Sequence, residues 1–217
     1  MNSFYQYPKV TQWFFAIFMI ILLFILLGLW TDAIGENLWF GLLIFLLVPL
    51  LQFLGTPLFR LLGTYQYLSP MLLVFSASDA RYDLHNGTSF DYLFVMRNTK
   101  PGIAWQQKIL AYYIEGFLVI IDRIETGKLA KTVEVRGSSY FFSESTTKRL
   151  GFELGPTGFG EKLNIFFNYL DLLWMLSLSK GSLTFPNLSN IKTARTTGEQ
   201  LCQQKARLLK LHAYLKR

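Results

Sequence analysis

The sequence predicts a membrane protein with an N-terminal two-helix transmembrane hairpin, followed by a cytoplasmic α+β domain with a C-terminal amphipathic helix. Three observations predict this class. Two long apolar runs lie near the N-terminus, helix and strand patterns alternate with turn residues behind them, and basic charge is concentrated in the last segment. We therefore divide the chain into a hairpin at residues 1–63, an α+β domain at 64–195 and a basic amphipathic helix at 196–217.

The two apolar runs cover residues 13–30 and 38–59, and neither contains a charged side chain. A helix of 18 residues, the length of the first run, rises about 27 Å, which approaches the roughly 30 Å of bilayer hydrocarbon. The second run contains Pro49, Gln52 and Pro57. Membrane helices tolerate such residues where neighbouring helices satisfy the freed backbone groups, so both runs are predicted to span.

Charged residues around the runs predict their orientation. The connection at 31–37 contains Asp32 and Glu36 but no Lys or Arg, whereas Lys9 precedes the first run and Arg60 closes the second. Under the positive-inside rule this places the connection outside and both termini in the cytoplasm, in an inner or plasma membrane. A cleaved signal peptide is the alternative for the first run, but such apolar regions usually have about 7–15 residues and no second apolar run follows them directly.

Turn residues divide the remaining chain into short elements. We expect a strand where apolar and polar residues alternate or where an apolar run is too short to cross a bilayer. We expect a helix where apolar residues recur every three or four positions or where a long apolar run ends at a helix-stop signal. This gives strands at 71–76, 131–136, 139–142 and 150–154, helices at 103–124 and 163–178, and a final helix with a capping box at Thr196-Thr197-Gly198-Glu199.

The Asn86-Gly87 pair is the strongest turn signal and admits two structures. The segments on its two sides could pair as a β-hairpin around a type I′ turn. Alternatively, Thr88 or its neighbour caps a helix that continues to Arg97, with Asp91 in the first turn. We favour the helix.

Two of the predicted helices could be mistaken for further membrane spans. Glu115 and Asp171 interrupt their apolar runs, and a span needs about 20 predominantly apolar residues. A four-span topology would also place the segment 123–162, with seven basic residues, on the outer side, against the positive-inside rule. Two spans remain the prediction.

Candidate catalytic residues are few. Two histidines stand far apart in the sequence, a single cysteine is present, and no glycine-rich phosphate loop occurs, so we expect no metal and no cofactor. The one local cluster consists of Asp83, His85 and Asp91, in which a carboxylate could orient an imidazole for acid–base chemistry. The alternative is a turn in which the same polar groups satisfy the backbone. Glu115 and Asp171 form a second candidate pair if their helices pack together.

Basic charge is concentrated after residue 179, where eight Lys and Arg face Glu199 as the single acidic residue. A basic amphipathic helix suits anionic lipid or an acidic partner. The alternative is that its leucines pack on the domain and its basic face is solvated. The residues expected to make lipid or partner contacts are Lys205, Arg207, Lys210, Lys216 and Arg217.

Together these patterns predict a membrane-anchored non-catalytic subunit, scaffold or assembly factor of a membrane complex. The expected partners are the lipid bilayer, another protein or a second copy of the chain, and anionic lipid. An enzyme acting on a lipid-linked substrate is the second reading, and a small oligomeric channel or effector is the third. Aromatic residues lie mainly in apolar helices and not in a basic stripe, which argues against a nucleic-acid partner.

Overall fold

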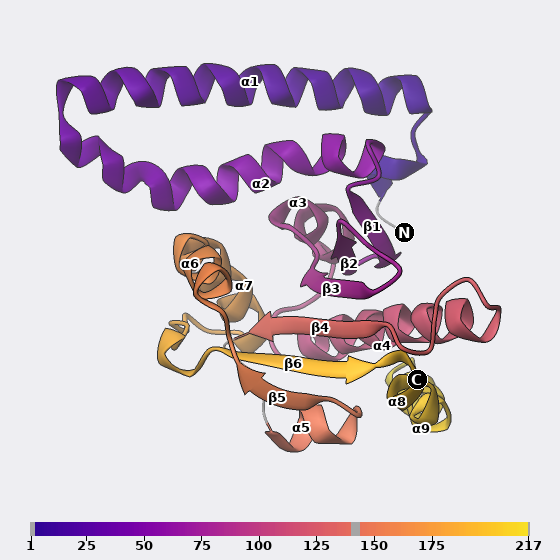
Figure 1. Cartoon of the computed structure of the whole chain (residues 1–217). Helices are drawn as coiled ribbons and strands as arrows, with labels where there is room; N and C mark the ends of the chain where they lie inside the picture. Colours follow the sequence, from indigo (N-terminus) through magenta and orange to yellow (C-terminus); the bar gives the residue numbers. More distant parts are fainter. Residues whose placement is uncertain (1–2, 140–143, 217) are drawn as a thin grey trace.

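The computed structural model describes residues 3–139 and 144–216. Two long antiparallel helices lie along one side of a mixed helix and sheet domain (Figure 1). They are α1 (Lys9–Glu36) and α2 (Ile44–Leu61), joined by the 3₁₀ segment η2 (Leu38–Leu43) and preceded by η1 (Ser3–Gln6). Both helical arms are long and apolar enough to cross a membrane, as the two apolar runs predict.

The second arm of the hairpin contacts the domain. Leu54, Gly55, Thr56 and Pro57 of α2 are buried, whereas the large apolar side chains of α1 are mostly exposed. The two arms meet each other in a small apolar cluster that includes Met19 of α1. α1 therefore presents an exposed apolar surface on the sides that are turned away from α2.

A six-stranded sheet forms the centre of the domain, in the order β1-β2-β3-β4-β6-β5. Strands β3 and β4 run parallel and the other neighbours are antiparallel. The bounds are β1 Tyr65–Ser69, β2 Leu72–Phe75, β3 Arg81–Asn86, β4 Glu134–Ser139, β5 Glu153–Pro156 and β6 Lys192–Thr197.

Helix α4 (Ile103–Glu125) covers one face of the sheet and supplies the crossover that a parallel β3–β4 pair requires. Gly116 allows its close approach to β2, since a Cβ at that position would lie 2.5 Å from Leu72 Cδ2. The main core lies between α4 and the sheet, and its fully buried members include Val74, Ile114, Ile120, Ile121, Val133, Val135, Leu201 and Leu208.

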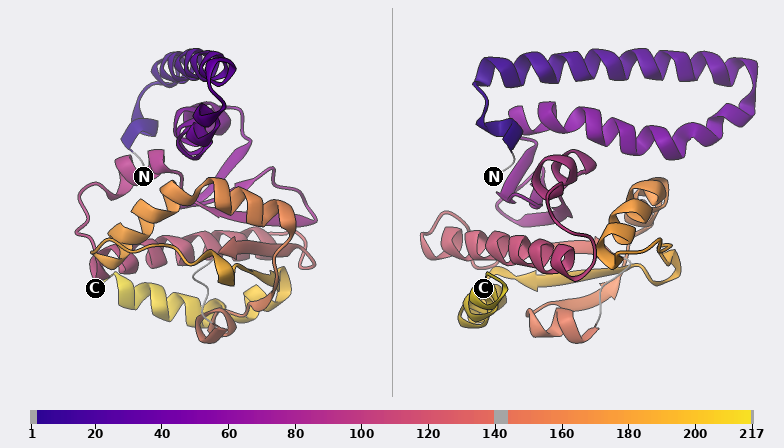
Figure 2. Two further views of the ribbon diagram at one scale, coloured as in Figure 1. Left: turned by 90° about the vertical axis from the view of Figure 1, so that its left-hand side faces the viewer. Right: turned by 180° about the vertical axis from the view of Figure 1, so that it is seen from behind.

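The other helices occupy three places around the sheet (Figures 1 and 2). The first group, α3 (Ser89–Asp91) with the π-helical turn η3 (Tyr92–Met96), follows β3 beneath α2. The second group, α6 (Phe159–Phe167) and α7 (Tyr169–Lys180), lies beside the hairpin. The third group, α8 (Gly198–Gln203) and α9 (Lys205–Leu215), lies on the side of the domain away from the hairpin. The short helices α5 (Glu144–Arg149) and η4 (Leu188–Asn190) complete the described part.

Several predicted elements are confirmed. The helix at 103–124 is α4, and the strands at 71–76, 131–136 and 150–154 correspond to β2, β4 and β5 with shifted ends. The segment after Asn86-Gly87 is helical, as favoured, because the Thr88 and Asp91 side chains form a capping box. Most of the strand predicted at 139–142 lies outside the described residues.

Three predictions of local structure are wrong. The helix expected at 163–178 is two helices, α6 and α7, which meet at Asn168, where the side-chain Nδ2 donates to Asn164 O at 2.8 Å. The final helix is also two, with a break at Gln204, and its capping box joins Thr197 to Gln200, one residue later than predicted.

The third error is the omission of three strands, β1, β3 and β6, of which β3 belongs only to the β-hairpin alternative at Asn86-Gly87. β6 is the polar run Lys-Thr-Ala-Arg-Thr-Thr, which lacks apolar alternation. Its inward face carries Ala194 and Thr196, both buried, and its partners on both sides stabilise it. β6 also runs across the boundary drawn at residue 195.

Candidate functional site on the open face of the sheet

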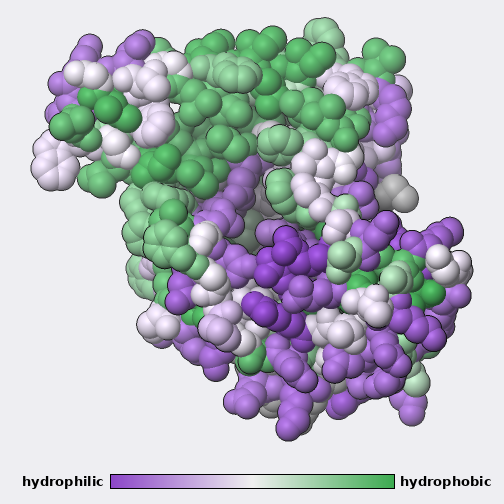
Figure 3. Space-filling model, in the orientation of Figure 1, coloured by the Kyte–Doolittle hydropathy of each residue, from purple (hydrophilic) through white to green (hydrophobic). Residues whose placement is uncertain are grey.

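Strand β3 divides its side chains between the two faces of the sheet. Tyr82 and Leu84 point to the core beneath α4. Because side chains alternate along a strand, Asp83 and His85 lie on the opposite face. This second face is open and strongly hydrophilic, with a hollow between it and the hairpin (Figure 3).

An ion-pair network crosses this open face. Asp83 stands opposite Arg136 of β4 and pairs with its Nε. Arg81 Nε lies 3.0 Å from Asp83 Oδ2. Arg136 also reaches Glu161 of α6, with Nη2 3.3 Å from Oε1. The Asp83 carboxylate raises the pKa of the Arg136 guanidinium through a hydrogen bond and through its charge, so Arg136 stays cationic between two carboxylates.

Hydroxyl groups complete the Glu161 end of the network. Ser138 Oγ and Thr193 Oγ1 lie 3.0 and 3.2 Å from Glu161 Oε2. Thr193 Oγ1 also lies 3.0 Å from Thr157 Oγ1. The backbone N–H of Gly158 donates to the same carboxylate oxygen at 3.3 Å, which caps α6. Glu161 therefore ties α6 to the sheet.

His85 is the titratable group of this face that stands apart from the network. Its side chain is exposed, and its ring centroid lies 6.3 Å from that of Phe75. Protein on both flanking strands removes part of the hydration of the ring, and this desolvation lowers the pKa of His85, although the charges of Asp83 and Glu161 oppose the shift. The imidazole is therefore neutral at pH 7 and free to accept a proton or a hydrogen bond.

The third candidate, Asp91, lies in a different place. It is fully buried beneath α2, where Oδ2 accepts from Tyr67 Oη at 2.6 Å and from the Thr88 backbone N–H at 3.0 Å. Thr56 Oγ1 of α2 lies 2.8 Å from Thr88 Oγ1. Asp91 thus joins the hairpin to the sheet and does not share the open face with Asp83 and His85.

Arg60 closes this buried cluster from the hairpin side. Its guanidinium carbon lies 3.4 Å from the ring centroid of Tyr5 and 4.4 Å from that of Tyr67, a cation–π arrangement. Burial, reinforced by the charge of Asp91, raises the pKa of both tyrosines. Both phenols therefore remain protonated donors. We call Tyr5, Thr56, Arg60, Tyr67, Thr88 and Asp91 the junction cluster.

The second predicted carboxylate pair does not form. Glu115 of α4 binds α9 instead, with Oε1 3.1 Å from His212 Nε2 and 3.0 Å from Lys216 Nζ. Asp171 accepts hydrogen bonds from Ser89 Oγ and from Trp174 Nε1, and burial raises its pKa. Each carboxylate therefore has its own partners, which are basic side chains for Glu115 and neutral donors for Asp171.

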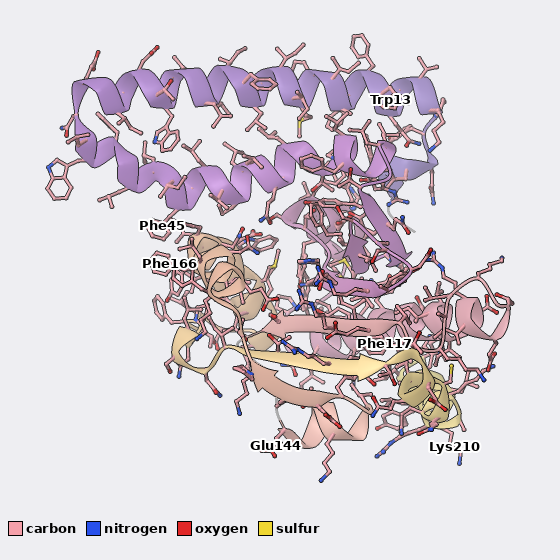
Figure 4. The ribbon with its side chains drawn as sticks, in the orientation of Figure 1. Trp13, Phe45, Phe117, Glu144, Phe166 and Lys210 are labelled. Atoms are coloured by element: carbon pink, nitrogen blue, oxygen red, sulfur yellow. The ribbon has the colours of Figure 1, made fainter. Side chains whose placement is uncertain are left out.

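The predicted contact residues of the C-terminal helix fall into two groups. Lys205 Nζ lies 2.5 Å from Glu125 Oε2 and Lys216 binds Glu115, so these two hold α9 on α4. Arg207 and Lys210 are exposed on α9, and Figure 4 places Lys210 far from the hairpin. Arg217 lies outside the described residues. The leucine face of α9 packs on the domain through Leu208, which is fully buried.

Sequence reasoning missed Arg136 and Glu161. The alternation in 131–136 does place Arg136 on the outer face of a strand, but no sequence signal brings α6 over that strand. Within the described residues no group of His, Cys, Asp and Glu could hold a metal ion. Comparison of the chain with family models, with curated proteins and with solved structures finds no match. Function must therefore be argued from the geometry.

Proposed function

We propose that this protein is a membrane-anchored, non-catalytic subunit, scaffold or assembly factor of a membrane complex. Its hairpin crosses the bilayer, and its α+β domain contacts partners on the cytoplasmic side. The second candidate is an enzyme that acts on a lipid-linked substrate through His85.

The exposed apolar surface of α1 supports this proposal most directly. The helix has 28 residues, and only Gln12, Ala16, Met19 and Leu23 are buried. Phe14 and Phe24 are 78% and 67% exposed. Water-soluble monomers rarely expose contiguous apolar patches of this kind, whereas lipid chains would cover them without cost.

The orientation follows from charge. Asp32 and Glu36 lie at the outer turn of the hairpin, and Lys9 lies at its base. Arg60 at the base is held between two tyrosine rings, which suits a cation at a membrane boundary. Both termini are therefore proposed to be cytoplasmic.

The state of the open face supports a scaffold over an enzyme. Asp83 pairs with Arg81 and Arg136, and Arg136 with Glu161 joins α6 to the sheet. Each of these charged groups therefore already has a structural role. The enzyme hypothesis rests on His85, because this side chain is exposed, neutral at pH 7 and adjacent to Asp83 on the same face of the sheet.

The membrane proposal is tested with single cysteines in a Cys202→Ser background. A membrane-impermeant thiol reagent should label Ile34→Cys in intact cells and Lys210→Cys only after permeabilisation. Labelling of Lys210→Cys in intact cells, with Ile34→Cys protected, would reverse the orientation.

The choice between scaffold and enzyme is tested at His85. Solubilisation in mild detergent should recover the protein with a partner, and His85→Ala should leave that partner and the cellular phenotype intact. An enzyme acting through His85 would lose the phenotype in this variant while abundance and copurification stay unchanged.

A further inference from the structure

The hairpin surface continues onto the domain. Figure 3 shows the hydrophobic surface running from the hairpin down one flank, over the position of α6 and α7 in Figure 1. Large apolar side chains of α6, α7 and the following loop are exposed, and we call them the apolar flank. They are Phe159, Leu163, Phe166, Trp174, Leu183 and Phe185, with exposed fractions of 81, 41, 47, 36, 72 and 64%.

Aromatic contacts join the apolar flank to the hairpin. The ring centroid of Phe45 in α2 lies 5.2 Å from that of Phe166 and 5.9 Å from that of Phe167. Phe45 and Phe166 lie together at the end of the hairpin away from Trp13 (Figure 4). The flank is therefore an extension of the surface that the proposed function places in lipid.

Charge is scarce along this part of the chain. Between Lys162 and Lys192 the sequence holds only Asp171 and Lys180 as charged residues. Asp171 is 5% exposed and satisfied by Ser89 and Trp174. Lys162 and Lys180 are exposed, and basic side chains of this kind extend toward anionic headgroups. This combination is typical of a segment seated at a membrane boundary and not in water.

The contact between Phe45 and α6 decides how the hairpin can cross. α1 has 28 residues, but its charged residues lie in the end turns, and its apolar part at residues 13–30 rises about 27 Å, which fits about 30 Å of hydrocarbon without a tilt. Phe45 precedes Arg60 by 15 residues, or roughly 22 Å of helix. An upright hairpin would thus carry α6 deep into the bilayer and bring the polar sheet with it.

A tilt toward the domain removes this conflict. The contacts of α2 with α6 and α7 give the direction of the tilt, because packing against neighbouring helices determines it. We infer that the hairpin crosses the membrane tilted and that the apolar flank is seated among the acyl chains of the cytoplasmic leaflet. This inference rests on the proposed function.

Spin-label depth measurements on the full-length protein in phosphatidylcholine and phosphatidylglycerol vesicles test it. In a Cys202→Ser background, nitroxides are attached to Leu183→Cys and Phe185→Cys. Phe24→Cys on the exposed face of α1 is the control for membrane insertion, and Tyr214→Cys, 67% exposed on α9, is the matched control for an apolar surface residue in water. Accessibility to oxygen reports lipid, and accessibility to a water-soluble nickel chelate reports water.

We expect both flank labels to favour oxygen over nickel several-fold more than the Tyr214 label does. Flank labels that are open to nickel while the Phe24 label is in lipid would overturn the inference and leave the proposed function standing. Flank labels shielded from both reagents would also overturn it, because a protein surface and not lipid would then cover the flank. A Phe24 label in water would overturn the proposed function itself.

Discussion

The junction cluster and the open face contain the same kinds of groups in opposite surroundings. Each has a carboxylate, an arginine and hydroxyl groups in mutual contact. Asp91 in the junction cluster is fully buried, whereas the side chain of Asp83 on the open face is 27% exposed. Eight residues of sequence separate two sites that differ in access to water.

This difference indicates what each site can do. Buried polar groups must satisfy one another, because no bulk water replaces a lost hydrogen bond. The junction cluster therefore fixes the angle between the hairpin and the sheet. The groups of the open face can exchange their protein partners for water or for a ligand, so binding or chemistry belongs there. Substitutions at both sites, with controls elsewhere in the domain, test this division.

The largest effect is expected at Asp91. Asp91→Ala leaves Tyr67 Oη and the Thr88 backbone N–H without their acceptor in a buried site, and we expect a loss of about 3 kcal/mol of folding free energy. Asp83→Ala is the matched change on the open face and should cost about 1 kcal/mol or less, since its ion pairs are partly solvated. Thermal unfolding in detergent micelles measures both. Equal losses would mean that burial does not distinguish the two sites.

Tyr67→Phe should have the next largest effect. The change keeps the ring under Arg60 and removes only the hydroxyl that donates to Asp91, so we expect a cost of about 1–2 kcal/mol. Tyr214→Phe removes a hydroxyl from an exposed ring on α9 and should leave the unfolding temperature unchanged. An unchanged unfolding temperature in Tyr67→Phe would show that water or another donor reaches Asp91.

Local sequence signals are sufficient to predict the hairpin and the helix that contains Asp91. The uncharged runs specify the hairpin, and the cap formed by Thr88 and Asp91 specifies a helix after Asn86-Gly87, because both depend on residues close in the chain. The sequence also places Asp83 and Asp91 in one cluster. It could not show that they separate, since α2 and β1 reach Asp91 from distant positions.

Long-range pairing accounts for most of what was missed. β6 is polar and is a strand because β4 and β5 bind it from both sides. Glu161 enters the open face through the packing of α6, which no local pattern encodes. The C-terminal leucine stripe was read correctly as amphipathic, but only the fold shows that Leu208 is buried against the domain.

The titration of His85 should make folding stability depend on pH, which gives a further test of the open face. Its pKa is lowered in the folded protein, so the unfolded chain binds more protons between the folded and unfolded pKa values. The contribution of His85 to the free energy of unfolding should therefore be fully present above about pH 6.5, which is the pKa of histidine in the unfolded chain. It should be lost as the pH decreases from there to the pKa of His85 in the folded protein. His85→Gln should remove this part of the pH dependence. An unchanged stability profile in the variant, or an NMR titration midpoint of His85 above 6.5, would contradict the assignment.

The smallest effect on the fold is expected for the two exposed basic residues of α9, Arg207 and Lys210. Arg207 and Lys210 face water on the side of the domain away from the hairpin. The double change Arg207→Gln with Lys210→Gln should alter the folding free energy by less than about 0.5 kcal/mol, because it touches no packed side chain and glutamine is a good helix former. Lys128→Gln with Lys131→Gln, in the exposed loop between α4 and β4, removes the same net charge and serves as the matched control.

If α9 binds an acidic partner, the α9 variant alone should lose that partner during copurification, and added salt should weaken the wild-type contact in the same direction. The position of α9 favours a protein partner over the membrane proposed to hold the hairpin, since the domain separates α9 from the hairpin. Equal copurification by wild type and both variants would leave α9 with one role, which is to cover α4 through Leu208 while Lys205 and Lys216 hold its ends.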